Sequence, residues 1–392
     1  MDLGGMKRNI PFLIELCKYH DVSVLAYGTA GQEREFRRAY GDHCDQIRFI
    51  PFKRSRWLTL LELIWLTLTG RSRFRQLYRK SMQRAIDEMC ATHCYELIHC
   101  CVQMFGIFRF PENISVTSDT HEVTYDLIGR AARNTPNLLR KLAGYWTSKV
   151  GKHDEMEFCR KFDLLITTTR RDQELFRRDL SNQNIQVIQN GAGEAFFNWE
   201  DKEPEPCSMV FTGLFSHLPN SDGIIYFLDR MFPLIARQEP TAKIWVVGKS
   251  PTKAIQARAS DRVIVTGFVD DVRPYMARAQ VFVIPLLAGG GIRGKALEAM
   301  AMRKPIVSTT IGVEGILLRH MESALIADSP DRFAEYVVQL FRDRTLRTRI
   351  SSQAHAIARE HYDWRNKGRE LERALSQIMA TRTQRSLALA HA

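Results

Sequence analysis

The sequence predicts an α/β protein of two domains, each with a doubly wound parallel sheet. Three observations lead to this prediction. The chain has 392 residues, more than one hydrophobic core usually supports. Its 45% hydrophobic and 26% charged residues are a globular composition. Short β-rich runs alternate with helical patterns, which is typical of parallel strands joined by crossover helices.

The alternation is clearest in the second half of the chain. Residues 220–238 are amphipathic, the Asp270-Asp271 pair is placed to cap a helix that ends near Arg278, and Asp331 opens another helix. This half is expected to form a C-terminal Rossmann-like domain over residues 208–364. Its predicted strands are residues 209–212, 243–247, 263–266, 281–284, 306–309 and 324–327.

The first half repeats the alternation less regularly, and we expect a second Rossmann-like domain over residues 1–190. The turn sequence Asn190-Gly191-Ala192-Gly193 and the polar segment after it predict a hinge over residues 190–207. The predicted strands are residues 22–26, 47–51, 96–102, 114–117, 164–168 and 186–188.

The start of the first domain departs from this pattern. A doubly wound domain usually opens with a strand that leads into a glycine turn. Here Gly4 and Gly5 come almost at once, and a helical pattern over residues 7–19 follows. The first N-terminal strand is therefore missing from the pattern. A true start upstream, a truncated chain and a domain without this strand all stay open.

Charge and cysteines restrict the partners and the compartment. The net charge of +12 indicates an anionic partner: nucleic acid, an acidic membrane or a phosphorylated substrate. All eight cysteines lie within residues 1–207, which argues against a disulfide framework and favours the cytoplasm. Residues 95–102 read as a buried strand with alternating faces. That pattern disfavours a metal site at Cys90, His93, Cys94, His99 and Cys100.

Export and membrane insertion are not expected. Residues 1–9 lack the apolar core of a signal peptide, and the apolar run of residues 57–69 is shorter than the roughly 20 residues that cross a bilayer. Residues 53–84 hold many arginines and a single acid, Glu62, so we expect an interfacial helix on anionic lipid, peripheral on the inner face of the cytoplasmic membrane. A core helix between solvated arginines is the alternative. The basic residues are Lys53, Arg54, Arg56, Arg71, Arg73, Arg75, Arg79, Lys80 and Arg84.

The richest segment, VFVIPLLAGGGIRGKALEAMAMRKPIVST at residues 281–309, reads as strand, glycine turn and helix. The glycines from Gly289 to Gly291 let backbone N–H groups approach an anion. Arg293 and Lys295 stand in a first helical turn, where cations oppose the helix dipole unless an anion is bound. The segment therefore predicts a phosphate site.

Glu298 lies three residues after Lys295, on the same helical face. Its carboxylate is expected to accept hydrogen bonds from two ribose hydroxyls beside the phosphate. An intrahelical pair of Lys295 and Glu298 on a solvated surface is the alternative.

This segment resembles the donor-binding signature of retaining glycosyltransferases of family 4, the glycosyl transferases group 1. The resemblance continues through residues 210–227, 244–251, 265–286 and 295–316, and exopolysaccharide-type sugar transferases are the most similar. It implies the GT-B architecture, with two facing Rossmann-like domains and an active site in the cleft between them. It also implies metal-independent hexosyl transfer with retention, from a UDP- or GDP-sugar to a glycan or lipid-linked acceptor, in exopolysaccharide or cell-surface glycan synthesis.

The resemblance assigns roles in the donor domain. Glu298 matches the second glutamate of the family's paired-glutamate motif, which binds the donor ribose. Gly290, grouped with Gly291 in the predicted donor site, stands where the first glutamate would be. The usual arginine and lysine after the first strand of this domain are absent, since they would fall near Leu214 and Pro219. We infer that Arg293 and Lys295 supply the phosphate-facing charge instead.

The N-terminal, acceptor domain resembles the family more loosely. Gly4 and Gly5 resemble its N-terminal glycine loop, which lies near the donor phosphate. Asp119 to Glu122 resembles its cleft motif, so His121 is the candidate for contacting the transferred sugar. A loop histidine without a role is the alternative, and Asp119 is also placed to cap a helix. A C-terminal helix over residues 365–385 is expected to pack back on this domain, and residues 381–392 are expected to be a frayed polar tail.

No residue pair reads as an activated nucleophile, so the expected mechanism is positioning plus electrostatic stabilisation of the departing diphosphate. No Asp-rich motif indicates a metal, and no cofactor is expected. Nucleic-acid binding is disfavoured because no recognition motif accompanies the charge. A non-catalytic GT-B protein that binds sugar nucleotides, and a sugar-nucleotide epimerase, stay open.

Overall fold

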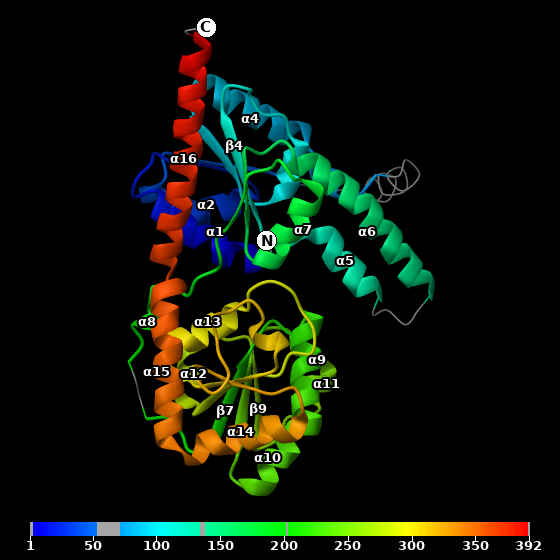
Figure 1. Cartoon of the computed structure of the whole chain (residues 1–392), viewed down its shortest axis with the longest axis vertical. Coiled ribbons are helices and arrows are strands. Elements are labelled where there is room, and N and C mark those ends of the chain that lie inside the picture. The colour runs from blue at the N-terminus through cyan, green and yellow to red at the C-terminus, as the bar shows by residue number, and fades with distance from the viewer. Residues whose placement is uncertain (1–2, 53–70, 134–137, 201–202, 391–392) are drawn as a thin grey trace. The chain divides into compact units, whose positions relative to one another are not determined.

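The computed structural model describes residues 3–52, 71–133, 138–200 and 203–390, and the chain divides into two compact units (Figure 1). Unit 1 comprises Met1–Ile188 and Gly368–Ala392, and unit 2 comprises Gln189–Lys367. All strand pairs within the sheets are parallel. The predicted α/β fold class is confirmed.

Unit 2 contains one six-stranded sheet in the order β12-β11-β10-β7-β8-β9. The two adjacent strands at the centre of this sheet, β7 and β10, are buried along their whole lengths. This burial is expected for strands covered on both faces. The strands are β7 (Ser208–Thr212), β8 (Lys243–Val247), β9 (Val263–Gly267), β10 (Val281–Ile284), β11 (Ile306–Ser308) and β12 (Leu325–Ile326).

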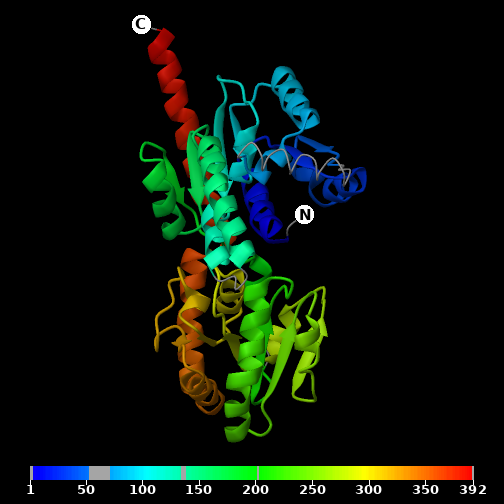
Figure 2. The same cartoon turned by 90° about the vertical axis from the view of Figure 1, so that its right-hand side faces the viewer.

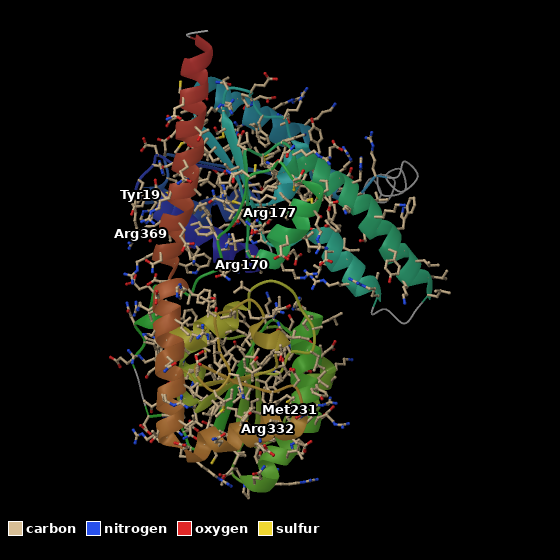
Figure 3. The ribbon with its side chains drawn as sticks, in the orientation of Figure 1. Tyr19, Arg170, Arg177, Met231, Arg332 and Arg369 are labelled. Carbon is tan, nitrogen blue, oxygen red and sulfur yellow. The ribbon has the colours of Figure 1, made fainter. Side chains whose placement is uncertain are left out.

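Helices cover both faces of this sheet (Figures 1 and 2). The helices α10 and α14 pack together, and α13 packs on α15. Met231 is buried in the core and Arg332 is exposed; both are labelled in Figure 3. The helices are α8 (Glu194–Phe197), α9 (Leu218–Tyr226), α10 (Phe232–Gln238), α11 (Lys253–Gln256), α12 (Arg273–Arg278), α13 (Gly294–Ala301), α14 (Pro330–Arg342) and α15 (Arg344–His361).

Unit 1 holds two separate parallel sheets within the described residues, one of β1 and β2 and one in the order β3-β4-β5-β6. The six predicted strands are all present: β1 (Ser23–Tyr27), β2 (Gln46–Ile50), β3 (Leu97–Cys100), β4 (Ser115–Thr120), β5 (Leu164–Thr167) and β6 (Ile185–Val187). The expectation of a buried strand over residues 95–102 was wrong, because β3 is half-buried over most of its length.

The first helix of unit 1, α1 (Leu3–Leu16), begins earlier than the predicted helix over residues 7–19 and contains Gly4 and Gly5. The expected glycine loop is thus the first turn of a helix. The other helices are α2 (Ala30–Tyr40), α4 (Lys80–Thr92), α5 (Thr124–Arg133), α6 (Leu138–Cys159) and α7 (Arg170–Asp179).

The last helix, α16 (Trp364–Ala390), crosses the boundary between the units at Gly368. Within unit 1, Leu371 and Leu375 are buried and Arg382 Nη1 donates to the carbonyl oxygen of Ile114 at 3.1 Å. The helix continues to Ala390, so the prediction of a frayed tail from residue 381 was wrong. Alanine, leucine, glutamine and arginine, which favour helices, make up eight of the twelve residues in 381–392.

Only part of the predicted interfacial segment, residues 53–84, lies within the described residues. The apolar run and residues 53–70 as a whole fall outside the described residues. One basic residue of this segment that is described, Arg75, binds carboxylates of the protein. Its Nη2 donates to Asp154 Oδ1 at 2.7 Å and to Glu157 Oε2 at 2.5 Å. Within the described ranges, no helix has both the length and the apolar character needed to cross a bilayer.

A buried ion pair joins α1 to the sheet of unit 1. Arg8 Nε and Nη2 donate to the two carboxylate oxygens of Asp119 at 2.5 and 2.7 Å, and both side chains are 1% exposed. Arg8 Nη2 also donates to the carbonyl oxygen of Ile188 at 2.9 Å. Burial alone would raise the pKa of Asp119, but the Arg8 guanidinium holds that pKa below its usual range.

Replacing Arg8 with methionine should lower the local free energy of unfolding of unit 1 by about 3–5 kcal/mol, because it leaves a buried carboxylate uncompensated. Hydrogen exchange of the β4 amides measures this loss. The Asp119 pKa is depressed in the folded state. Its stabilisation is therefore present above the ordinary pKa of 3.8 and is lost as the pH falls through the folded-state value.

The matched control is Arg171→Met, which removes an exposed pair with Asp126 at 2.9 Å and should cost less than about 1 kcal/mol. Equal losses in the two variants would show that the buried pair does not hold α1 in place.

Candidate donor site

The predicted donor residues gather at one edge of the sheet in unit 2. The strands β7 and β10 are neighbours, and the strand order continues outward from them in opposite directions. Ligands in open α/β sheets bind beyond the carboxyl ends of the strands at such a reversal. The loop after β7, residues 213–217, and the loop after β10, residues 285–293, both leave from this point.

The glycine turn after β10 is closed by Arg293. Gly289 and Gly291 have φ angles of +145° and +69°, which favour glycine. Arg293 is 8% exposed, and its Nη1 donates to the carbonyl oxygens of Gly290 and Gly291. Arg293 therefore binds the backbone of the turn, and its contact with a phosphate stays a prediction.

Lys295 reaches from α13 to the first turn of α9 and to the end of β7. Its Nζ donates to Asn220 Oδ1 at 2.8 Å and lies 3.9 Å from the centroid of the Phe211 ring. The Asn220 amide is itself oriented, because its Nδ2 donates to the carbonyl oxygen of Leu214 at 2.9 Å. Lys295 thus brings a cation to the loop near Leu214, where the family resemblance expected a basic residue.

Glu298 is one turn further along α13 and is 9% exposed. The alternative of a pair on a solvated surface does not fit this burial. The contact of Glu298 with a donor ribose stays a prediction.

Two glycines that the sequence analysis missed bring the ends of β7 and β8 together. Gly213 N donates to the carbonyl oxygen of Val247 at 2.9 Å. Gly248 has a φ of +148°, and a Cβ atom there would overlap the carbonyl oxygen of Gly213. A Cβ atom at Gly213 would in turn lie 3.1 Å from Lys295 Nζ. The sequence did contain a signal for this contact, because a glycine directly follows each of the predicted strands 209–212 and 243–247.

The remaining candidates belong to unit 1. His121 follows β4 directly, and Thr168 Oγ1 donates to its carbonyl oxygen at 3.2 Å. Gly4 and Gly5 lie one helical turn before Arg8, which pairs with Asp119 two residues before His121. The ion pair therefore places the first turn of α1 near the carboxyl end of β4.

Asp119 does not cap a helix, because it is held by Arg8. The helix that follows, α5, begins at Thr124, and the backbone N–H groups of Thr124 and Tyr125 donate to the Glu155 carboxylate, both at 3.0 Å. Glu155 is buried, and this desolvation raises its pKa despite the hydrogen bonds that it accepts. The capping alternative for Asp119 was wrong because a carboxylate distant in sequence takes that role.

Among the residues that the structure describes, no group of three or more His, Cys, Asp or Glu side chains is placed to hold a metal ion. His93 Nε2 lies 2.8 Å from Gln46 Nε2, and His99 Nδ1 lies 2.9 Å from Thr117 Oγ1. These two histidines thus contact different neighbours on separate sheets.

Comparison with known proteins supports the resemblance. Residues 206–343, which include the whole glycine turn, Lys295 and Glu298, match the family model "Glycosyl transferases group 1". The chain therefore carries a glycosyl transferases group 1 domain.

The chain is also similar to an uncharacterised protein of the cps region of Klebsiella pneumoniae, at 24% identity over 43% of this chain. A second relative is the lipopolysaccharide core biosynthesis glycosyltransferase LpsE of Rhizobium meliloti, at 30% identity over 30% of this chain. The matches span 45% and 36% of these relatives, less than half of their lengths.

Solved structures share the fold over nearly the whole chain. The Anabaena protein Alr3699/HepE in complex with UDP-glucose has a TM-score of 0.65 at 15% identity and covers 96% of each chain. The sucrose-phosphate synthase of Thermosynechococcus elongatus has a TM-score of 0.59 at 17% identity, over 94% of this chain and 98% of its own. The predicted GT-B fold is confirmed.

Replacing Gly248 with alanine should destabilise unit 2 by at least about 1–3 kcal/mol, because alanine is strained at this φ and its methyl group would meet Gly213. Thermal unfolding of the variant measures the loss. Gly294→Ala is the control, since no atom lies within 4 Å of a Cβ atom there. Equal stability of the two variants would contradict the close approach of the β7 and β8 ends.

Proposed function

We propose that this chain is a glycosyltransferase that moves a sugar from a nucleotide-sugar donor to a hydroxyl group of a glycan or lipid-linked acceptor. The observation that carries the proposal is the position of Lys295 beside a glycine turn, at the strand reversal of a glycosyl transferases group 1 domain. Unit 2 would bind the donor, and unit 1 would bind the acceptor.

In this proposal, the donor diphosphate lies against the turn that contains Gly290 and Gly291 and against the N-terminus of α13. Lys295 contacts a phosphate oxygen, because a cation held by an amide and an aromatic ring is already oriented before the ligand arrives. Glu298 accepts hydrogen bonds from the ribose. Arg293 keeps the carbonyl oxygens of the turn directed away from the phosphate.

The chemical step breaks the bond between the anomeric carbon and the diphosphate oxygen, and the electron pair leaves with the nucleoside diphosphate. Lys295 and the backbone N–H groups of the turn would stabilise the charge that develops on that oxygen. The acceptor oxygen forms the new glycosidic bond, and its hydroxyl proton passes to the departing diphosphate. The family resemblance supports retention of configuration, independence of metal ions, and a donor-side role for Gly4 and Gly5.

Relatives support the classes of donor and acceptor. Structures of the similar Anabaena protein hold UDP, or UDP-glucose, so a UDP-sugar is the first donor to test and a GDP-sugar the second. A relative named for lipopolysaccharide core biosynthesis favours cell-surface polysaccharide as the product. A lipid-linked acceptor would also explain basic residues 53–84 as an attachment to anionic lipid at the cytoplasmic face.

The donor site predicts stabilisation by one class of nucleotide. At a concentration of 100 Kd, a UDP- or GDP-sugar should stabilise the folded chain by about 2.7 kcal/mol in thermal unfolding. Lys295→Met should weaken this binding roughly 10- to 100-fold, because a charge-assisted hydrogen bond is worth about 1.5–3 kcal/mol. Glu298→Gln should weaken binding of the nucleoside diphosphate but not of inorganic diphosphate.

The control is Lys253→Met, which removes an exposed lysine from the same unit and should leave nucleotide affinity unchanged. Equal affinity in the parent chain and in Lys295→Met would contradict the proposed phosphate contact.

His121→Ala should lower turnover on the order of tenfold or more while nucleotide affinity stays unchanged, because a residue that contacts only the transferred sugar acts on the reaction step. Release of nucleoside diphosphate with and without acceptor measures turnover. His153→Ala, at an exposed position on α6, is the control. Nucleotide binding without turnover in the parent chain would instead identify a non-catalytic sugar-nucleotide binding protein.

A further inference from the structure

A second loop of unit 2, residues 311–317 in the segment after β11, packs against the glycine turn of the candidate donor site. The strands that lead into this loop and into the turn, β11 and β10, are neighbours in the sheet. Arg293 Nη2 donates to the carbonyl oxygen of Ile311 at 3.4 Å. A Cβ atom at Gly315 would lie 3.3 Å from Ile292 Cδ1. The backbone of the loop therefore borders the place proposed for the diphosphate.

Two side chains hold this loop from the segments that join the two units. The chain leaves unit 1 after residue 188 and returns to it after residue 367. Directly after the first boundary, Gln189 Nε2 donates to the carbonyl oxygen of Gly315 at 3.0 Å. Shortly before the second, the hydroxyl of the fully buried Tyr362 accepts a hydrogen bond from Leu317 N at 2.9 Å. All four residues belong to unit 2.

The two joining segments, residues 189–192 and 362–364, are bonded to each other and are called the crossing pair below. Ala192 N donates to the carbonyl oxygen of Tyr362 at 2.6 Å, and Trp364 N donates to that of Ala192 at 3.4 Å. The segments approach closely at Gly191, where a Cβ atom would lie 2.9 Å from the Tyr362 carbonyl oxygen. The loop is thus held by two side chains of one connected piece of backbone.

We propose that Tyr362 and Gln189 are positioning residues for the donor, which hold the loop of residues 311–317 against the glycine turn. A loop that is fixed before the ligand arrives needs less ordering when the ligand binds, and this raises affinity. Such a coupling is reciprocal, so a bound nucleotide stabilises the crossing pair in turn. The proposal rests on the proposed donor site, and it adds two residues that act on the ligand through the loop.

The first test measures the affinity of the full chain for UDP, or for GDP if GDP binds more tightly, by isothermal titration calorimetry. Tyr362→Phe and Gln189→Met each remove one hydrogen bond to the loop and nearly keep the size of the side chain. Each should weaken binding roughly three- to tenfold, within the range of a single hydrogen bond. The control, Tyr336→Phe, removes a buried hydroxyl bonded to Arg332 and His320 and should leave the affinity unchanged.

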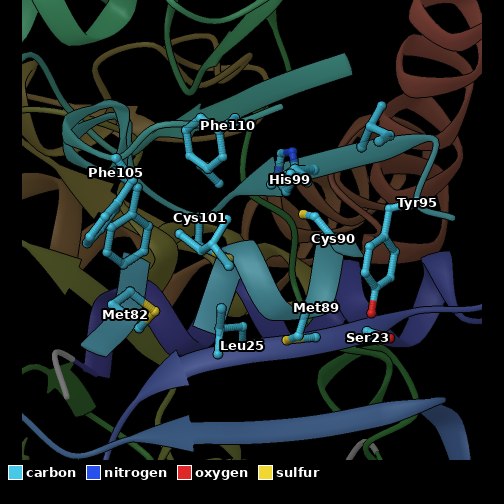
Figure 4. Close-up of a pocket in the computed structure, with 15 residues that line it drawn as sticks. Ser23, Leu25, Met82, Met89, Cys90, Tyr95, His99, Cys101, Phe105 and Phe110 are labelled. Carbon is cyan, nitrogen blue, oxygen red and sulfur yellow. The ribbon is translucent and has the colours of Figure 1, made fainter. Parts of the chain in front are cut away.

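Hydrogen exchange separates positioning from a general loss of stability. Saturating nucleotide should slow exchange of the crossing pair at least about threefold in the parent chain. In Tyr362→Phe this slowing should be absent, although the glycine turn is still protected. The strands β1 and β3, which line an apolar cavity of unit 1 (Figure 4), are the internal reference and should exchange equally with and without nucleotide.

Equal nucleotide affinity in the parent chain and in both variants would overturn this proposal and leave the donor site standing. Slowing of the crossing pair in Tyr362→Phe that equals the slowing in the parent chain would overturn it as well. Failure of the parent chain to bind either nucleotide would contradict the proposed function itself, and the positioning role with it.

Discussion

The Lys295 ammonium lies where two loops of unit 2 meet, and several features of the unit serve to keep it there. The reversal of strand order between β7 and β10 places the two loops side by side. Gly213 leaves room beside the ammonium group, and Asn220 accepts its hydrogen bond. A positive charge in the first turn of α13 is unfavourable towards the helix dipole, so this arrangement stabilises the unit fully only when an anion is present.

Two buried arginines hold the backbone in place around the candidate residues. Arg293 closes the glycine turn through backbone carbonyl oxygens, and Arg8 fixes the start of α1 to β4 through Asp119. Each guanidinium is rigid and offers several donors at once, so one side chain sets the geometry of a whole loop or helix end. The candidate binding residues themselves, Lys295 and His121, lie beside these supports.

Much of this organisation was predictable from the sequence. Buried parallel strands are continuous apolar runs, so all twelve predicted strands were found. A glycine turn before a helix with basic residues indicated the candidate donor site, which stays a prediction. The pairing of Lys295 with Asn220 and of Arg8 with Asp119 was not predictable, because the partners are 75 and 111 residues apart. The burial of Arg293 against the turn carbonyls was not predictable either, because burial depends on tertiary packing that a local pattern does not contain.

The central claim is that the diphosphate of a nucleotide sugar binds to the glycine turn and the first turn of α13. Hydrogen exchange with and without a saturating nucleoside diphosphate tests it most directly, because the claim concerns backbone N–H groups. The account predicts slower exchange over residues 289–296 and 213–217, and unchanged exchange in β1 and β2 of unit 1. Demonstrated binding with unchanged exchange in both loops would contradict it.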